Sequence, residues 1–297
     1  MTTDLDALLA ALYVFIDDHV APCTGGRRIG RPPKLTDAEL LCLAVAQVLL
    51  GFPSARHWIR FAHARLSHLF RYLPQQSGYN KRLNAAGPLI SRVIEALARQ
   101  VPTWHDDLRL IDSTPLPCAA SRETVKRSGL AGHAGYGYCR SHSRFFWGLR
   151  LYVVTTAEGM PVTWCLANPK LGEREVMTAL LERDHHLIRK GQVILADKGF
   201  AGKDFETFLT DRLGVHLVRP DRKDEPVRHG RLARSRQWIE AVFDTLKGQL
   251  GLEQHGGRTP AGVFARTAQR LLALATAIWH NWTTGAKTKR SLIAYDH

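Results

Sequence analysis

Two aspartates in a basic chain have the type and position suited to metal-dependent chemistry. Asp112 ends the apolar segment 108–112 and Asp197 ends the apolar segment 192–197, and the composition of both segments predicts strands. If these strands are central neighbours in a sheet, their carboxylates meet at one edge. Like charges so close repel unless a cation holds them, and carboxylate oxygens are hard ligands that suit Mg²⁺ or Mn²⁺. Both aspartates are therefore candidate catalytic metal ligands.

Glu240 is the candidate for a third ligand, on a helix predicted over 235–250. The apolar stripe of this helix contains Ile239, Val242, Phe243, Leu246 and Leu250. Arg236, Glu240 and Lys247 share a face beside the stripe, at steps of four and seven. With the two aspartates, Glu240 would complete a two-metal site whose ions lie roughly 4 Å apart, as in phosphoryl transfer. Each acid also has an ordinary explanation, as a turn or cap aspartate or as a solvated partner of Arg236.

The elements that must position these acids alternate between strand and helix after a short meander. In chain order the predicted elements are strands 108–112, 145–156 and 161–168, helix 173–188, strand 192–197, helix 203–212, strand 215–220 and helix 235–250. This βββαβαβα order predicts an α/β protein with a mixed sheet and helices on its faces. It is also the order of the RNase H-like fold, in which each of the three acids falls where that fold places its metal ligands.

The charge of the chain indicates a polyanionic partner. Its 297 residues include 41 Lys and Arg against 27 Asp and Glu, for a formal net charge of +14. The excess is concentrated in residues 51–100, where Glu95 is the only acid. A cationic surface of this size makes nucleic acid the first hypothesis, although a GC-rich genome also raises the arginine content.

Residues 1–104 are predicted to form a helical, helix-turn-helix-like DNA-binding region. A capping-box pattern at Thr36 begins one helix, and Ser54 is the expected N-cap of the next. Arg56 and Arg60 fall on the face of the second helix opposite its apolar residues. A short Gly/Pro turn between two helices is typical of a DNA reader and equally of an ordinary helical hairpin.

Two basic stretches in the second half of the chain are further candidates for DNA contact. The stretch 115–145 is predicted to be a flexible loop that clamps a phosphate backbone or stacks on a base, or else is simply solvated. The stretch 222–236 leads into the helix of Glu240, and Lys198, beside Asp197, could neutralise a phosphate. The candidate DNA-binding residues of the two stretches are Arg127, Arg140, Arg144, Arg231, Arg234 and Arg236, with Lys247 on the same helix.

Other classes of protein are excluded by simple features of the chain. No apolar run reaches the roughly 18 residues that a membrane span needs, and the N-terminus carries acids where a secretory signal carries bases. Five scattered cysteines without a CxxC motif argue against a disulfide framework or a zinc ribbon. We therefore expect a cytoplasmic protein, associated with the bacterial nucleoid if its partner is DNA.

The three acids carry a resemblance to a known family. The segments LRLIDSTP around Asp112, VILADKGF around Asp197 and RSRQWIEAVFDTLK around Glu240 resemble those of DDE transposases encoded by bacterial insertion sequences. Intervals of 85 and 43 residues between successive acids suit a catalytic domain without a large inserted domain. The resemblance extends over nearly the whole chain.

A finer resemblance rests on the residues around Glu240. Arg236, Glu240 and Lys247 match the spacing of a signature found in one large branch of these enzymes. The tyrosine that this branch carries three residues before the arginine is Ala233 here. This departure fits a related family better, and the stretch 111–153 together with the helical N-terminal region most resembles insertion-sequence family 982.

The resemblance implies that successive regions of the chain have different functions. It implies an RNase H-like catalytic domain over 105–253, after the DNA-binding region 1–104 and before a C-terminal helix and basic tail over 254–297. It implies Mg²⁺ as cofactor, with Mn²⁺ as a substitute, and double-stranded DNA as partner, in the form of terminal inverted repeats and a target. Hydrolysis at the end of the element and attack of the freed 3′-OH on target DNA would require at least a homodimer. Two alternatives remain open: an RNase H-like nuclease that does not join strands, and a non-enzymatic DNA-binding protein descended from a transposase.

Overall fold

The computed structural model divides the chain into two compact units, which are described separately. The described residues are 3–20, 33–139, 143–221 and 233–295, and the side chains of 3 and 233–236 are outside the description. The first unit comprises Met1–Val101, Leu246–Gly257 and Ala261–His297, and the second comprises Pro102–Thr245 and Arg258–Pro260. The C-terminal helix is thus grouped with the N-terminal helices, and the boundaries expected at 104 and 253 stay a prediction about domains.

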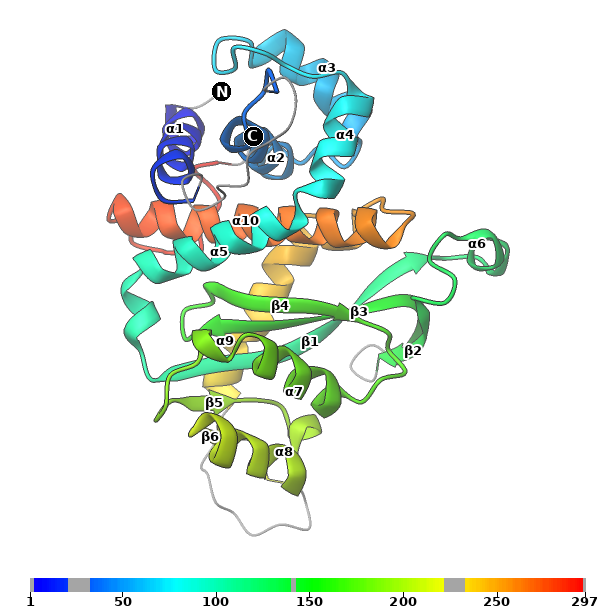
Figure 1. The fold of residues 1–297 in the computed structure, drawn as a ribbon, viewed down its shortest axis with the longest axis vertical. Coiled ribbons are helices and arrows are strands. Elements are labelled where there is room, and N and C mark those ends of the chain that lie inside the picture. The colour runs from blue at the N-terminus through cyan, green and yellow to red at the C-terminus, as the bar shows by residue number, and fades with distance from the viewer. Residues whose placement is uncertain (1–2, 21–32, 140–142, 222–232, 296–297) are drawn as a thin grey trace. The chain divides into compact units, whose positions relative to one another are not determined.

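The first unit is built from helices in its described part (Figure 1). The α-helices are α1 Thr3–His19, α2 Asp37–Leu49, α3 Ala55–Arg65, α4 Gln76–Ala85, α5 Gly87–Gln100 and α10 Pro260–Thr283. The predicted capping box begins α2, because Thr36 Oγ1 accepts from the Glu39 N–H at 3.1 Å and Glu39 Oε2 accepts from the Thr36 N–H at 2.6 Å. Ser54 caps α3 as expected, accepting from the His57 N–H at 3.4 Å. The predicted pair of helices is confirmed.

A buried polar cluster fixes α10 against α2 and α4 within the first unit. Gln47 Oε1 accepts from the Tyr79 hydroxyl at 2.7 Å and from Gln269 Nε2 at 3.0 Å. The same Gln269 amide group donates to the Ala44 carbonyl at 2.8 Å. Because an unpaired buried polar group costs about 1–3 kcal/mol, these bonds specify how the three helices pack.

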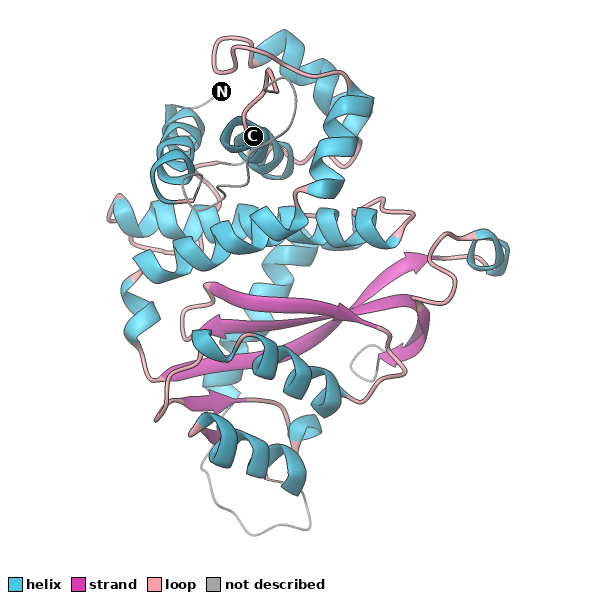
Figure 2. Cartoon of the chain, in the orientation of Figure 1, coloured by secondary structure: helices cyan, strands magenta, loops and turns pink. Residues whose placement is uncertain are grey.

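The second unit is a six-stranded mixed sheet with helices on its faces, which confirms the predicted fold class (Figure 2). Its strands are β1 Leu108–Ala119, β2 Gly135–Cys139, β3 Arg144–Thr156, β4 Pro161–Ala167, β5 Val193–Leu195 and β6 His216–Val218. The order is β2-β3-β1-β5-β6, with β4 also paired to β3. β1, β5 and β6 pair in parallel, whereas β3 pairs antiparallel with β1, β2 and β4.

Helices cover both faces of this sheet. α7 Glu173–Arg183 and the helical segment α8 Lys203–Thr207 pack on one face over a core that includes Ile111 and Ile194. α9 Ala233–Asp244 contacts β1 and passes behind the sheet in the view of Figure 1. The apolar stripe predicted for helix 235–250 is buried at all five positions. α9 and the segment that follows it therefore pack as the periodicity indicates.

The stretch 115–145 differs from the predicted loop. β1 runs on to Ala119, the helix α6 Arg122–Arg127 follows, and β2 adds a strand to the predicted βββαβαβα order. Asp112 therefore lies inside β1 and not at its end. Pro115 and Pro117 both stay paired with β3, opposite Arg150 and Gly148.

Candidate active site

Parallel pairing of β1 with β5 brings together the strand segments that precede the two aspartates. The last paired residues are Leu110 and Leu195, so Asp112 and Asp197 each come two residues after the same pair. Adjacent strands lie about 4.8 Å apart, so residues in the same register on parallel strands are close neighbours. Both aspartates are half-buried. The prediction that these strands are neighbours is confirmed.

Each aspartate is held by the backbone of the residue that follows it. Asp112 Oδ1 accepts from the Ser113 N–H at 2.7 Å. Asp197 Oδ1 accepts from the Lys198 N–H at 2.7 Å and so caps the short 3₁₀ helix Lys198–Phe200. Hydrogen bonds to an ionised acceptor are roughly twice as strong as neutral ones, so both carboxylates have a preferred orientation.

Glu240 is carried by α9, the helix that contacts β1. Ile239 and Val242 are buried, while Glu240 is on the exposed side of the helix. Within the described ranges, no group of three His, Cys, Asp or Glu side chains lies close enough together to hold a metal ion. The Asp112 and Asp197 carboxylates fit a divalent ion by donor type, whereas a shared ion between them and a three-ligand set with Glu240 stay predictions.

An ion pair beside the aspartates was not predicted from the sequence. Arg150, on β3, pairs with Glu173, the first residue of α7, and their side chains are 17% and 33% exposed. Arg150 Nη1 also donates to Ser113 Oγ at 3.1 Å, and that hydroxyl donates to Glu173 Oε1 at 3.3 Å. The three side chains form a small network that reaches the residue next to Asp112. A single arginine inside the apolar strand FFWGLRLYVVTT was the signal for it, since a charge in a core strand requires a partner.

The same network reaches the segment next to Asp197. A Cβ atom on Gly199 would lie 2.8 Å from Glu173 Oε2, so this carboxylate rests directly against the backbone of residue 199. The next residue of α7, Arg174, donates to the Ala201 carbonyl at 3.0 Å. The N-terminus of α7 therefore supports the turn that follows Asp197, while Ser113 joins it to β1.

Comparison with known proteins decides the family. A family model described as the transposase DDE domain matches residues 103–276, which is more than half of the chain. The chain belongs to the transposase DDE domain family. Membership implies phosphoryl transfer on DNA that depends on a divalent metal ion, and the sheet described above is the RNase H-like core of such a domain. The assignment to insertion-sequence family 982 stays a prediction.

Other comparisons add little to this family assignment. The cryo-EM structure of a piggyBac transposase synaptic complex with hairpin DNA is similar at a TM-score of 0.44 and 9% identity. That alignment covers 97% of this chain and 77% of the other. No curated protein matches the chain. Among the described residues, no helix is long and apolar enough to cross a membrane.

The basic residues predicted to bind DNA in this DDE family member lie on several elements. Those with described side chains are Arg56 and Arg60 on α3, Arg127 on α6, Arg144 at the start of β3, Lys198 after Asp197, and Lys247 in the π-helical segment Thr245–Gln249. All of these are exposed except Lys247, which is half-buried. Arg140 and Arg231 fall outside the described residues, as do the side chains of Arg234 and Arg236. The DNA-binding role of all of them stays a prediction.

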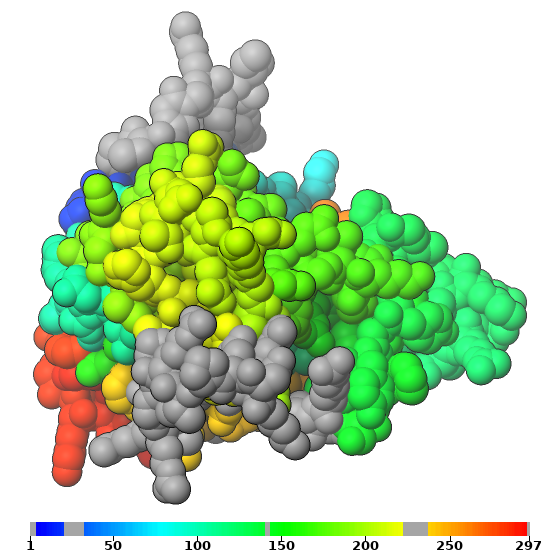
Figure 3. Space-filling model, turned by 90° about the horizontal axis from the view of Figure 1, so that it is seen from below, coloured from blue at the N-terminus to red at the C-terminus, as the bar shows by residue number. Residues whose placement is uncertain are grey.

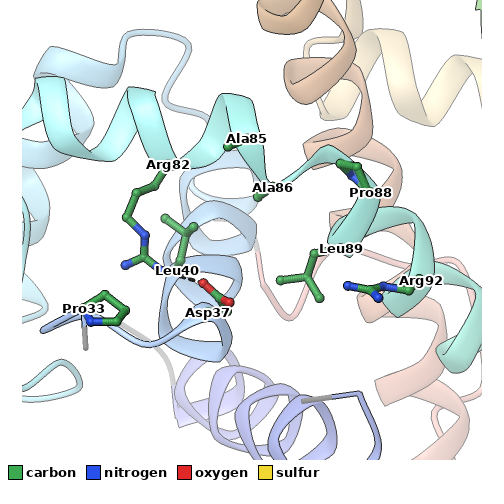
Figure 4. A pocket seen from close by; sticks show the side chains of 9 residues that line it. All are labelled: Pro33, Asp37, Leu40, Arg82, Ala85, Ala86, Pro88, Leu89 and Arg92. Atoms are coloured by element: carbon green, nitrogen blue, oxygen red, sulfur yellow. Dashed lines mark hydrogen bonds and ion pairs between the residues drawn. The ribbon is translucent and has the colours of Figure 1, made fainter. Parts of the chain in front are cut away.

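A pocket of about 420 Å³ lies within the first unit, between α2, α4 and α5 (Figure 4). Arg82 lies at one side of it and pairs with Asp37 at 2.6 Å, and Arg92 lies at the other side. None of the residues predicted to bind metal or DNA lines this pocket. It is therefore not part of the candidate active site.

Proposed function

We propose that the protein is the transposase of a bacterial insertion sequence, acting on the terminal inverted repeats of its element and on a target DNA. The observation that carries the proposal is the parallel pairing of β1 with β5, whose last pair comes two residues before Asp112 and Asp197, in a chain of the transposase DDE domain family. The protein cuts a phosphodiester at the end of the element, and the freed 3′-OH then attacks the target. Joining two ends requires two active sites, so the working form is at least a homodimer.

The roles of the residues follow from their chemistry. Asp112, Asp197 and Glu240 are the residues that would hold Mg²⁺, with Mn²⁺ as a substitute. When bound, such an ion polarises the phosphoryl group and stabilises the leaving oxygen. Ser113 and Lys198 orient the two aspartates through their backbone N–H groups, and the exposed Lys198 ammonium lies where a DNA phosphate can be neutralised. Catalysis of this kind is mainly positioning and charge neutralisation, so no covalent nucleophile is needed.

In this proposal the basic residues bind the DNA. Arg56 and Arg60 on α3 would bind the inverted repeat, and Arg127 and Arg144 would contact the DNA near the cleaved bond. Phosphate contacts release counterions. Each lysine or arginine that binds a phosphate therefore steepens the plot of the logarithm of the binding constant against the logarithm of salt concentration by about one unit. Replacing Arg56 and Arg60 by alanine is expected to lower that slope by about two.

The test is a cleavage and strand-transfer assay on labelled DNA taken from the boundary of the element. The assay is run in parallel with Mg²⁺ and with EDTA, which removes the metal ion. Asp112→Asn, Asp197→Asn and Glu240→Gln are expected to lower both cleavage and joining by about 10³-fold while repeat binding is kept. Asp244→Asn, an exposed acid on the same helix as Glu240, is the matched control and should retain activity. Full activity of any of the first three variants would remove that residue from the site.

The same assay separates the two alternatives. Cleavage without joined products would identify a nuclease of the same fold. Repeat binding with no cleavage in any metal would identify a DNA-binding protein descended from a transposase. Each observation that supports one of these alternatives supports the transposase equally.

A further inference from the structure

The β2–β3 hairpin presents aromatic side chains to solvent. In β2, Tyr136 and Tyr138 alternate with Gly135 and Gly137, and the two tyrosines are 53% and 44% exposed. Phe145, at the start of β3, is 77% exposed. A strand normally buries its aromatic residues, so three exposed rings on one short hairpin require an explanation.

Strand register places these rings together. Tyr138 lies opposite Phe145, and their ring centroids are 4.9 Å apart with the rings tilted by 53°. Residues directly opposite each other in an antiparallel pair share a face of the sheet. Tyr136 lies two positions from Tyr138 and is on the same face. The three rings therefore form one surface, which we call the aromatic face.

The opposite side of β2 is closed by close contacts at its glycines. A Cβ atom on Gly135 would lie 2.5 Å from Asn168 Oδ1, and one on Gly137 would lie 2.7 Å from the Phe146 ring. The Asn168 amide also donates to the His133 carbonyl at 3.0 Å, which anchors the start of β2. A one-residue register slip that turned the tyrosines to that side would bring their Cβ atoms against Asn168 and Phe146, so the packing favours the register that exposes the aromatic face.

The surroundings of the aromatic face are basic. α6 and the hairpin lie at the same end of the second unit (Figures 1 and 3). Among the described residues of α6 and of the hairpin, the exposed basic ones are Arg122, Lys126, Arg127 and Arg144. The only acid on α6 is Glu123, which already pairs with Lys126 at 3.0 Å. An occupant must therefore combine negative charge with flat apolar groups.

Nucleotides meet both requirements, and the exposure of the rings selects unpaired ones. In a duplex the faces of the bases are covered by their neighbours, whereas a base in a single strand has a free face on which an aromatic ring can stack. We propose that the aromatic face stacks on an unpaired nucleotide of the DNA substrate, while the neighbouring arginines and lysines hold its backbone. The proposal rests on the proposed function for its substrate, but not on catalysis.

The test compares binding of a duplex with a four-nucleotide single-stranded tail and of the blunt duplex. The tail carries 2-aminopurine, whose fluorescence is quenched on stacking. Wild type should quench it, and Tyr138→Ala/Phe145→Ala should lose the quenching and bind the tailed DNA about tenfold to a hundredfold more weakly. Blunt-duplex affinity should change less than twofold.

Controls separate stacking from general effects. Tyr13→Ala removes an exposed tyrosine of the first unit and should leave the quenching intact. Tyr138→Phe keeps a ring and should restore most of it, and circular dichroism checks that the hairpin variants are folded.

Three outcomes would overturn the proposal. The first is unchanged quenching in the double variant, and the second is equal wild-type affinity for tailed and blunt DNA. The third is a loss of self-association in the double variant, which would make the aromatic face an interface between copies of the chain. Every protein in this comparison carries Asp112→Asn, and "wild type" refers to the unchanged aromatic face. Because binding is measured without catalysis, a failure of strand transfer does not affect the result.

Discussion

The ion pair between Arg150 and Glu173 provides the most direct test of how the two aspartates are held. Glu173 contacts Ser113 through its Oε1 and the backbone of Gly199 through its Oε2, and these are neighbours of the two aspartates in sequence. If this network positions the carboxylates, breaking it must change both folding stability and the cleavage rate. We therefore consider Arg150→Ala, Glu173→Ala and the double variant.

The magnitude follows from the burial of the pair. Two unit charges about 4 Å apart attract each other by about 4 kcal/mol at the effective dielectric constant of 20 that suits groups near a surface. With 17% and 33% of the two side chains exposed, desolvation and solvent screening remove part of this attraction. Exposed pairs contribute about 0–1 kcal/mol, and breaking a buried pair costs about 3–5 kcal/mol. We expect each single variant to lose about 2 kcal/mol, and the coupling energy of the pair to be about 1–2 kcal/mol.

The stability assay is urea unfolding of the four proteins, analysed as a double-mutant cycle. The pair Arg99 and Glu95, four residues apart on α5 with side chains 46% and 28% exposed, is the matched surface control. Its coupling energy should not exceed about 0.5 kcal/mol. A coupling energy for Arg150 and Glu173 as small as that of the control would refute the reasoning from burial.

The catalytic arm separates positioning from simple loss of stability. Because a displacement of about 1 Å can cost about a hundredfold in rate, Glu173→Ala should slow cleavage by about ten- to a hundredfold at a temperature where it stays folded. Repeat binding should not change. Glu173→Gln keeps an acceptor for Arg150 and Ser113 and should recover most of the rate. Wild-type cleavage by Glu173→Ala would show that the network supports folding alone.

Three further predictions concern other parts of the chain. Gly148→Ala should destabilise the protein by about 3 kcal/mol or more in urea unfolding, because its Cβ would lie 2.1 Å from the Leu116 carbonyl oxygen, which belongs to the neighbouring strand. Tyr79→Phe should cost about 1–2 kcal/mol in the same measurement, since it removes the hydroxyl that donates to Gln47. Burial lowers the pKa of His280 below its usual 6.5, so the unfolded chain binds the proton first as the pH falls. The unfolding free energy should therefore drop as the pH falls below about 6.5, and a pH series of His280→Gln should show a smaller drop.

Local patterns in the sequence were sufficient for much of the fold. The capping box at Thr36 and the apolar strand 145–156 could be read directly, because each depends on residues close together in the chain. The segment 135–139 was missed because its alternation is inverted, with glycines on the packed side and tyrosines on the exposed side. Glycine has low strand propensity, so this pattern is typical of a loop until its packing partners are known.

The candidate site was only partly predictable for a different reason. The aspartates stand out because each follows an apolar strand core, but an interval of 85 residues does not reveal the register of two strands. The partner of Arg150 was also beyond local reasoning, since the nearby part of the chain offers several acids and only the docking of α7 selects Glu173. Packing decides long-range pairing of this kind, and a single sequence does not reveal that packing directly.

The two aspartates differ in what fixes their position, and this difference explains where the network lies. Asp112 is inside β1 and stays paired with Val153 of β3, so the sheet itself holds its backbone. Asp197 lies two residues beyond Leu195, the last residue of β5 that pairs with β1, although the Ala196 N–H still donates to the Val218 carbonyl at 3.0 Å. The Glu173 carboxylate rests against Gly199 in the segment after Asp197, and its hydrogen bond to Ser113 ties that segment back to β1. The side-chain network thus supports the site at the point where strand pairing ends, which is why a side chain at position 199 would disturb Asp197 more than Asp112.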